Sequence, residues 1–324
     1  MRNRIKAMHK GIGQGTAALL LAIFSNFLPA QDYPAKPIRF VVGPGPDALA
    51  RAVSQKLTDA WGQQIVIDQR PGAGGSIAAD IVAKARGDGY TLLLATGSHT
   101  INAALQKQSY DLVRDFRAVS LVGSVPFILV VHPSMPVHSV RELIDLARAK
   151  PGALNYGSAG NGTPPHLAGE MLKTLAGINL VHVPYKTAAQ AMIDVLSGQP
   201  QLMFAVAPVG LPQVKAGRVR GIAVSTAQRS RMAPDLPTVA EAGVPGFDVI
   251  GWNGVLAPAG TPPVIINKLY GELEKALKQQ DVVQRLAATG FEPVGSNPAA
   301  FAEFVQKDIE RWARVIRDAG IRMD

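Results

Sequence analysis

The sequence contains no cysteine, so the chain has no disulfide framework, no thiolate metal site and no redox-active thiol pair. It also lacks the lipid-modified N-terminal cysteine of a lipoprotein. Stability must therefore come from a hydrophobic core, for which the chain is long enough.

The patterns of catalytic and metal sites are missing as well. No two histidines stand four residues apart with a glutamate between them, so we expect no metal site. Ser158 lies in YGSAG, which is not the G-x-S-x-G elbow of a nucleophilic serine. No acidic pair indicates an acid/base couple. We expect no catalytic residue and no organic cofactor.

The chain begins with an apolar stretch too interrupted to span a membrane. Thr16–Leu28 is broken by Ser25 and Asn26 and follows four basic residues. This pattern predicts a signal peptide over residues 1–30, cleaved after Ala30, and delivery to the periplasm. The alternative is an uncleaved membrane anchor.

Cleavage would lower the net charge from +9 to +5, because residues 1–30 carry four basic and no acidic groups. No run of Lys and Arg is interleaved with aromatic residues, and the positive charges alternate with acids along the predicted helices. These features exclude a nucleic-acid partner and suit an anionic small molecule.

The remaining 294 residues exceed what one core comfortably fills, so two lobes are expected. From residue 38 onward, short β-branched runs alternate with amphipathic stretches. This alternation predicts an α/β fold with parallel sheets covered on both faces.

Two long extended runs, Val125–Pro133 and Phe247–Pro262, look like crossings between the lobes. If both cross, the first lobe consists of residues 31–130 plus 251–324, and the second of residues 131–250. The result would be a clamp with a two-stranded hinge.

Several loops of small residues lead into predicted helices, and the richest runs from Gly157 to Pro165. Helix N-termini favour anions. Thr163 is a suitable N-cap and Pro164 a suitable first helical residue. His99 and His166 lie at or beside such loops, where each is either a hydrogen-bonding partner of a ligand or a surface or capping histidine. The loop would grip an anion; the alternative is a turn that holds nothing.

Long segments of the chain resemble one protein family. They include DQRPGAGGSIAADIVAKARGDGYTLLLAT, LNYGSAGNGTPPHLAGEML, VHVPYK, DLPTVAEAGVPGFDV and LAPAGTP. They are similar to segments of the Bug family, the periplasmic solute receptors of tripartite tricarboxylate transporters. The resemblance runs from about Tyr33 to the C-terminus. It implies a type II periplasmic binding protein fold, with two doubly wound lobes joined by a two-stranded hinge and closing on a small carboxylate.

Backbone N–H groups and small hydroxyls hold the carboxylate in that family. The positions implied here for the carboxylate are Gly43, Pro44, Gly45, Ser98, His99, Thr100, Asn102, Ser158, Ala159, Gly160, Asn161, Gly162 and Thr163, with His166 beside this loop. The remainder of the ligand would face the second lobe near Lys186, Thr187, Ala205 and Val206, which form a distal pocket.

The chain departs from the family pattern at two of these places. The Gly43–Asp47 loop is about four residues shorter than usual, which leaves open whether the cleft binds at all. Ala205 and Val206 stand where many members have an acidic residue. We therefore expect a less polar distal pocket, a plain or aromatic carboxylate as ligand, and weaker binding after Ala205→Asp.

The resemblance implies a monomeric receptor that delivers its ligand to the membrane subunits of a tripartite transporter. A receptor that reports to a sensor kinase is the alternative, and a periplasmic enzyme is a third reading that no nucleophile–base pair supports.

Overall fold

The computed structural model describes residues 33–43, 48–318 and 320–321, so the predicted signal peptide, Pro44 and Gly45 lie outside it. The strands are β1 (Ile38–Val42), β2 (Ile65–Gln69), β3 (Thr91–Thr96), β4 (Phe116–Val131), β5 (Asn155–Ser158), β6 (Val181–Pro184), β7 (Leu202–Val206), β8 (Arg220–Val224), β9 (Ile250–Pro258) and β10 (Glu292–Pro293). The helices are α2 (Ala48–Trp61), η2 (Ala73–Gly75), α3 (Ser76–Ala83), α4 (Gly97–Leu105), α5 (Val140–Ala149), α6 (Pro164–Ala176), α7 (Ala188–Leu196), α8 (Ala207–Lys215), α9 (Pro263–Lys278), α10 (Gln280–Ala288) and α11 (Pro298–Asp318).

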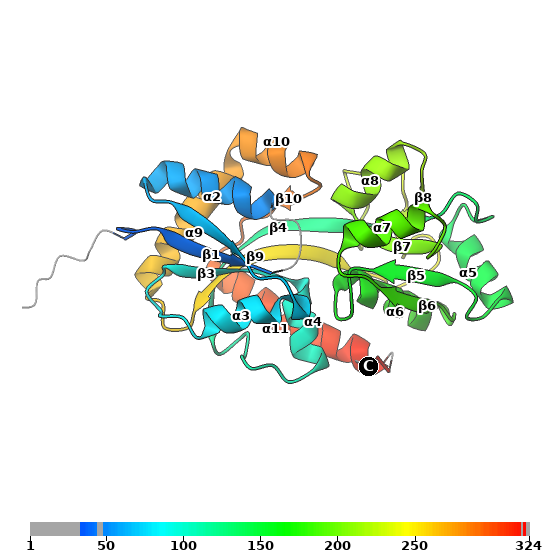
Figure 1. The fold of residues 1–324 in the computed structure, drawn as a ribbon, viewed down its shortest axis with the longest axis horizontal. Coiled ribbons are helices and arrows are strands. Elements are labelled where there is room, and N and C mark those ends of the chain that lie inside the picture. The colour runs from blue at the N-terminus through cyan, green and yellow to red at the C-terminus, as the bar shows by residue number, and fades with distance from the viewer. Residues whose placement is uncertain (1–32, 44–47, 319, 322–324) are drawn as a thin grey trace, which may run out of the picture.

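The strands form two groups that lie side by side (Figure 1). The first has the order β2-β1-β3-β9-β4, with β10 on β4. The second contains β7, β5 and β6, with β8 also paired to β4. Within each group the strands that alternate with helices are parallel, as predicted. The expectation of purely parallel sheets is wrong, because β4 and β9 enter antiparallel to their neighbours.

Strand β4 joins the two groups. Its first part, up to Pro126, pairs with β9, and from Phe127 onward it pairs with β7 and β8. The chain returns beside it, where Val249 donates its N–H to the Ser225 carbonyl and Ile250 pairs with Pro126. The two predicted extended runs thus form the two-stranded hinge. The proposed lobes, 31–130 plus 251–324 and 131–250, have their breaks close to these changes in pairing.

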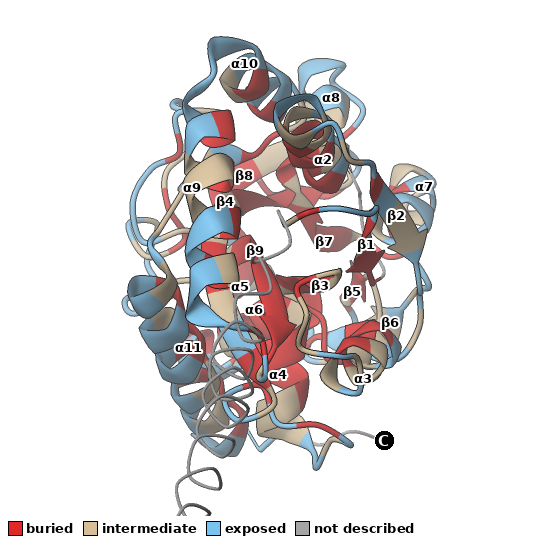
Figure 2. Ribbon diagram, turned by 90° about the vertical axis from the view of Figure 1, so that its left-hand side faces the viewer, coloured by how far each residue is buried: buried red, intermediate tan, exposed pale blue. Residues whose placement is uncertain are grey.

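Helices cover both faces of the sheets. The inner strands are buried, the edge strands β2 and β6 are partly exposed, and the helices expose their outer faces (Figure 2). In β4 the apolar residues Val125–Val131 are at most 4% exposed, since this segment packs against helices on both faces. The sequence of a strand that is buried on both faces is a continuous apolar run, and this run predicted the strand.

The C-terminal helix α11 contacts both lobes. Phe301 and Val305 pack into the cluster beneath β3 and β9, while Trp312 and Ile316 pack with core residues of the second lobe. Figure 1 shows the helix running beneath the molecule toward the second lobe. Assigning all of residues 251–324 to the first lobe is therefore incomplete.

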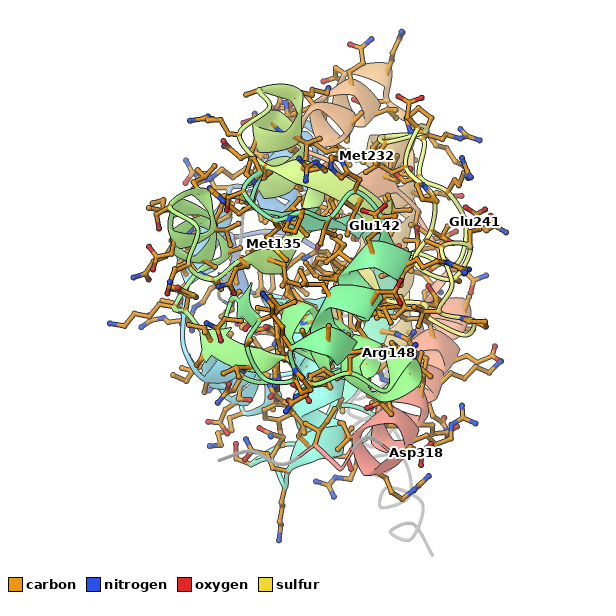
Figure 3. The ribbon with its side chains drawn as sticks, turned by 90° about the vertical axis from the view of Figure 1, so that its right-hand side faces the viewer. Met135, Glu142, Arg148, Met232, Glu241 and Asp318 are labelled. Carbon is orange, nitrogen blue, oxygen red and sulfur yellow. The ribbon has the colours of Figure 1, made fainter. Side chains whose placement is uncertain are left out.

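At the far end of the second lobe, helix α5 exposes one face to solvent. Glu142 lies near its beginning and Arg148 near its end (Figure 3). Ser139 caps the start of α5, because its Oγ accepts from the Glu142 N–H at 3.2 Å. Arg148 donates to the Ala176 carbonyl and so links α5 to α6. Among the residues that the structure describes, no helix has the length and apolar character of a membrane span.

Candidate functional site

A small cavity of about 110 Å³ lies where the lobes meet. Its walls are mostly apolar and come from both lobes and the hinge. They comprise Val42, Gly43, Leu94, Thr96, Gly97, Ser98, Val125, Phe127, Pro164, Val206, Gly251, Trp252, Asn253 and Phe291. Pockets that hold drug-sized ligands measure roughly 300–1,000 Å³, so this cavity is smaller than such a pocket.

The N-terminus of α4 supplies one end of the cavity. Gly97 and Ser98, in the first turn of this helix, line the cavity. First-turn N–H groups have no acceptor within their own helix and carry the positive end of the helix dipole. The turn can therefore hold a carboxylate, and the Ser98 hydroxyl lies beside the same N–H groups.

His99 and Thr100, the next two residues, serve the helix rather than the cavity. His99 is fully buried, and its Nδ1 accepts from the Thr96 N–H at 3.0 Å, completing a capping box at the start of α4. Burial lowers the pKa of His99 to about 4, so the ring is neutral near pH 7. Thr100 Oγ1 donates to Asp308 of α11 at 2.6 Å. Neither residue lines the cavity, because both side chains are used to fix α4.

The loop from Gly157 to Thr163 also uses its polar groups internally. The Gly160 N–H donates to Ser158 Oγ at 3.0 Å, the Gly162 N–H donates to His166 Nδ1 at 3.2 Å, and Thr163 Oγ1 donates to the Gly160 carbonyl at 2.6 Å. As predicted, α6 begins at Pro164 after Thr163. The two prolines that open α6 have no N–H, which leaves fewer donors here than the sequence suggested.

This loop instead contacts the other lobe. A Cβ on Gly162 would lie 2.5 Å from Asn102 Oδ1, so only glycine allows α4 and the loop to approach this closely. Asn102 also donates to the Gly74 carbonyl at 3.3 Å. Beside this contact, Pro164 lies against Gly97. Asn102 and the loop thus meet across the two lobes, while neither Asn102 nor the residues from Gly157 to Thr163 line the cavity.

Of the four residues predicted for the distal pocket, only Val206 lines the cavity. Ala205 faces the other side of β7, where its Cβ lies opposite Gly210. Lys186 is exposed, and Thr187 caps α7 by accepting from the Gln190 N–H at 3.2 Å. The apolar character expected of this pocket is present, and it comes from Val206, Phe127 and Phe291.

Asn253 is a lining residue that the sequence reasoning missed. It lies on β9, is 8% exposed and lines the cavity. Because an amide can both donate and accept a hydrogen bond, one that lines a cavity is a candidate for contact with a ligand. A polar residue inside the buried run IGWNGVLAP was the available signal.

Within the described ranges, no group of histidine and acidic side chains is arranged to hold a metal ion. The polar groups of the cavity are thus a helix N-terminus, the hydroxyl residues Thr96 and Ser98, and the Asn253 amide. Groups of this kind can bind and orient an anion, and none of them is an activated nucleophile.

Comparison with known proteins decides the family. The family model of the tripartite tricarboxylate transporter family receptor, TctC, matches residues 49–321 of the chain. The chain belongs to this receptor family. Protein BugT of Bordetella pertussis is 35% identical over 301 residues, covering 91% of this chain and 92% of BugT. The protein is a periplasmic solute-binding receptor and not an enzyme.

Solved structures of the family share the fold. Rpa4515 of R. palustris, solved with adipate, has a TM-score of 0.84 and 37% identity, over 90% of this chain and 99% of that chain. MatC from Rhodopseudomonas palustris, solved with bound malate, has a TM-score of 0.80 and 31% identity, over 88% of this chain and 100% of that chain. The receptor therefore has the two-lobed periplasmic binding protein fold that the family resemblance implied.

Proposed function

We propose that the receptor captures a small carboxylate in the interlobe cavity and delivers it to the membrane subunits of a tripartite tricarboxylate-type transporter. We further propose that it is exported by the signal peptide of residues 1–30, cleaved after Ala30, and acts as a monomer. The cavity itself carries the proposal, because it joins the N-terminus of α4 to apolar walls from both lobes.

Different walls of the cavity would hold the carboxylate and the carbon chain of the ligand. The carboxylate lies at Gly97 and Ser98, where a charged acceptor gains about 1.5–3 kcal/mol from each hydrogen bond. The carbon chain lies against Val206, Phe127 and Phe291. A ligand that touches both lobes favours the closed form by its differential affinity for the two states. Adipate, the ligand in the Rpa4515 structure, combines these two kinds of surface.

The test is a thermal-shift and calorimetry panel with adipate, malate, benzoate, an amino acid and the matching amides. A ligand at about 100 times its dissociation constant adds ~2.7 kcal/mol of stability, which corresponds to a shift of several degrees. We expect shifts with one or more carboxylates and none with their amides. Folded protein that responds to no carboxylate, both as purified and after unfolding and refolding, would refute the proposal.

A further inference from the structure

Three aromatic rings are stacked beneath the Gly157–Thr163 loop. Tyr156 of β5 lies 4.9 Å from His182 of β6, and His182 lies 4.2 Å from His166 of α6, measured between ring centroids. The rings lie within 26° of parallel. Tyr156 and His182 are direct partners across the two strands, so the sheet register itself creates the stack.

Each imidazole of the stack bonds to a different end of the loop. His182 Nε2 lies 2.7 Å from Ser158 Oγ, and His166 Nδ1 accepts from the Gly162 N–H at 3.2 Å. Ser158 Oγ in turn accepts from the Gly160 N–H at 3.0 Å. The two histidines thus fix both the beginning and the end of the loop.

The bond to the loop requires the neutral form of His166, because its Nδ1 needs a lone pair to accept from the Gly162 N–H. Ser158 Oγ accepts from the Gly160 N–H, lies 3.2 Å from the Gly160 carbonyl and shares a hydrogen bond with His182 Nε2 at 2.7 Å. Two charged imidazoles stacked at this distance would also repel each other.

The surroundings of the stack favour neutrality. Glu170 and Lys173 of α6 form an ion pair beside it, and Tyr156 donates to Glu170 at 2.6 Å. Burial lowers the pKa of both histidines, that of His182 to about 3. On the other face of the sheet, Tyr185 contacts Gly157 and lies beside Asp194 of α7.

We propose that His166 and His182 are positioning residues whose neutral imidazoles hold the loop in the conformation that meets Asn102 of the other lobe. Without either hydrogen bond the loop loosens, and ligand capture weakens with it. The consequence for the ligand rests on the proposed function, whereas the consequence for the loop does not.

The test measures amide hydrogen exchange in a peptide spanning residues 157–166 of the ligand-free receptor. Paired variants separate the hydrogen bond from the stacking. His182→Phe and His166→Phe keep a flat ring without the bond, whereas His182→Gln and His166→Asn keep a polar atom near Nε2 and Nδ1. Ser158→Ala breaks the bond to His182 without changing either histidine.

We expect the phenylalanine variants and Ser158→Ala to exchange about five- to tenfold faster in this peptide, in line with the loss of one net hydrogen bond. The glutamine and asparagine variants should exchange close to the wild-type rate. In the wild type, exchange corrected for its intrinsic rate should accelerate as the pH falls from 7 to 4. In each conservative variant this acceleration should be smaller, because one of the titrating rings has been removed.

Unchanged exchange in the phenylalanine variants would overturn the proposal. The proposal would also be overturned if the phenylalanine and the conservative variants exchanged faster than the wild type by the same factor, because packing of the rings alone would then hold the loop. The pH series on the wild type needs no variant to fold, and a flat series counts against the proposal. Since no ligand is present, these outcomes do not depend on whether the receptor binds a carboxylate.

Discussion

Ala205 and Val206 are neighbours in β7 whose side chains lie on opposite faces of the sheet. Ala205 is fully buried opposite Gly210, where an ideal Cβ on the glycine would lie only 2.9 Å away. Val206 lines the interlobe cavity. The same substitution at these two positions therefore has different physical consequences.

We expect Val206→Asp to weaken carboxylate binding by more than about tenfold, because like charges at close range cost several kcal/mol. Ala205→Asp should instead lower the melting temperature by several degrees, since it buries an unpaired charge. The sequence alone predicted a ligand effect at Ala205, and the face of the strand changes that expectation. Calorimetry with adipate and thermal unfolding of both variants check the difference. A loss of stability confined to Val206→Asp would contradict it.

Asn253 allows a second test at the residue scale. Asn253→Leu replaces an amide that lines the cavity with an apolar group of similar size. We expect the melting temperature to stay the same or rise, while the affinity for adipate falls about tenfold, the value of one hydrogen bond to a charged group. Thermal unfolding and calorimetry measure the two effects. A clear drop in stability would show that the amide has a structural partner.

At the scale of elements, Asp308 of α11 joins three parts of the molecule. Its carboxylate accepts from Thr100 of α4 at 2.6 Å, from Trp252 of β9 at 3.0 Å and from Arg311 at 2.8 Å. Arg311 also donates to the Asp248 carbonyl at 2.9 Å, next to the hinge. Asp308 is 4% exposed, so its carboxylate is buried, and it accepts all three of these hydrogen bonds.

We expect Asp308→Asn to destabilise the protein by about 3–5 kcal/mol, because it leaves Arg311 partly buried without its counter-charge. Thr100→Val removes one hydrogen bond from the same carboxylate and should cost about 1 kcal/mol. Denaturant unfolding of both variants provides the comparison. Equal costs would contradict a central role for the charge of Asp308.

The elements that the sequence predicted well are those with a strong local signal. The apolar run of β4 and the start of α6 at Pro164 follow from residue type and spacing. The roles of Thr100 and Ser158 could not be predicted in this way. Their partners are Asp308 and His182, and only tertiary packing brings these residues together.

The same contrast appears at the scale of the whole molecule. Two crossing runs predicted two lobes and a hinge, because a strand buried on both faces has a continuous apolar sequence. The donors of the cavity were harder to predict. A loop rich in small residues looks like an anion grip, but in Gly157–Thr163 the donors bond to the loop itself and to His166. Counting the partners of each N–H group requires the fold.

The buried histidines predict how the stability of the whole molecule depends on pH. The pKa values of His99, His166 and His182 are all lowered, chiefly by burial, to about 4 for His99 and about 3 for His182. In the unfolded chain the same rings titrate near 6.5. Between these values the unfolded state binds more protons, so the stability present above pH ~6.5 is lost as the pH falls toward the folded pKa values.

We therefore expect the free energy of unfolding to fall steadily from pH 6.5 to 5, with a slope of up to about 1.4 kcal/mol per pH unit for each histidine. The window isolates the histidines, because carboxylates in unfolded chains titrate near 4 and contribute mainly below it. Urea unfolding at pH 7, 6.5, 6, 5.5 and 5 measures the slope. His99→Asn keeps an acceptor for the Thr96 N–H and removes one titrating ring, so its slope should be smaller by about one third. A flat wild-type profile in this window would mean that the rings are accessible to protons in the folded receptor.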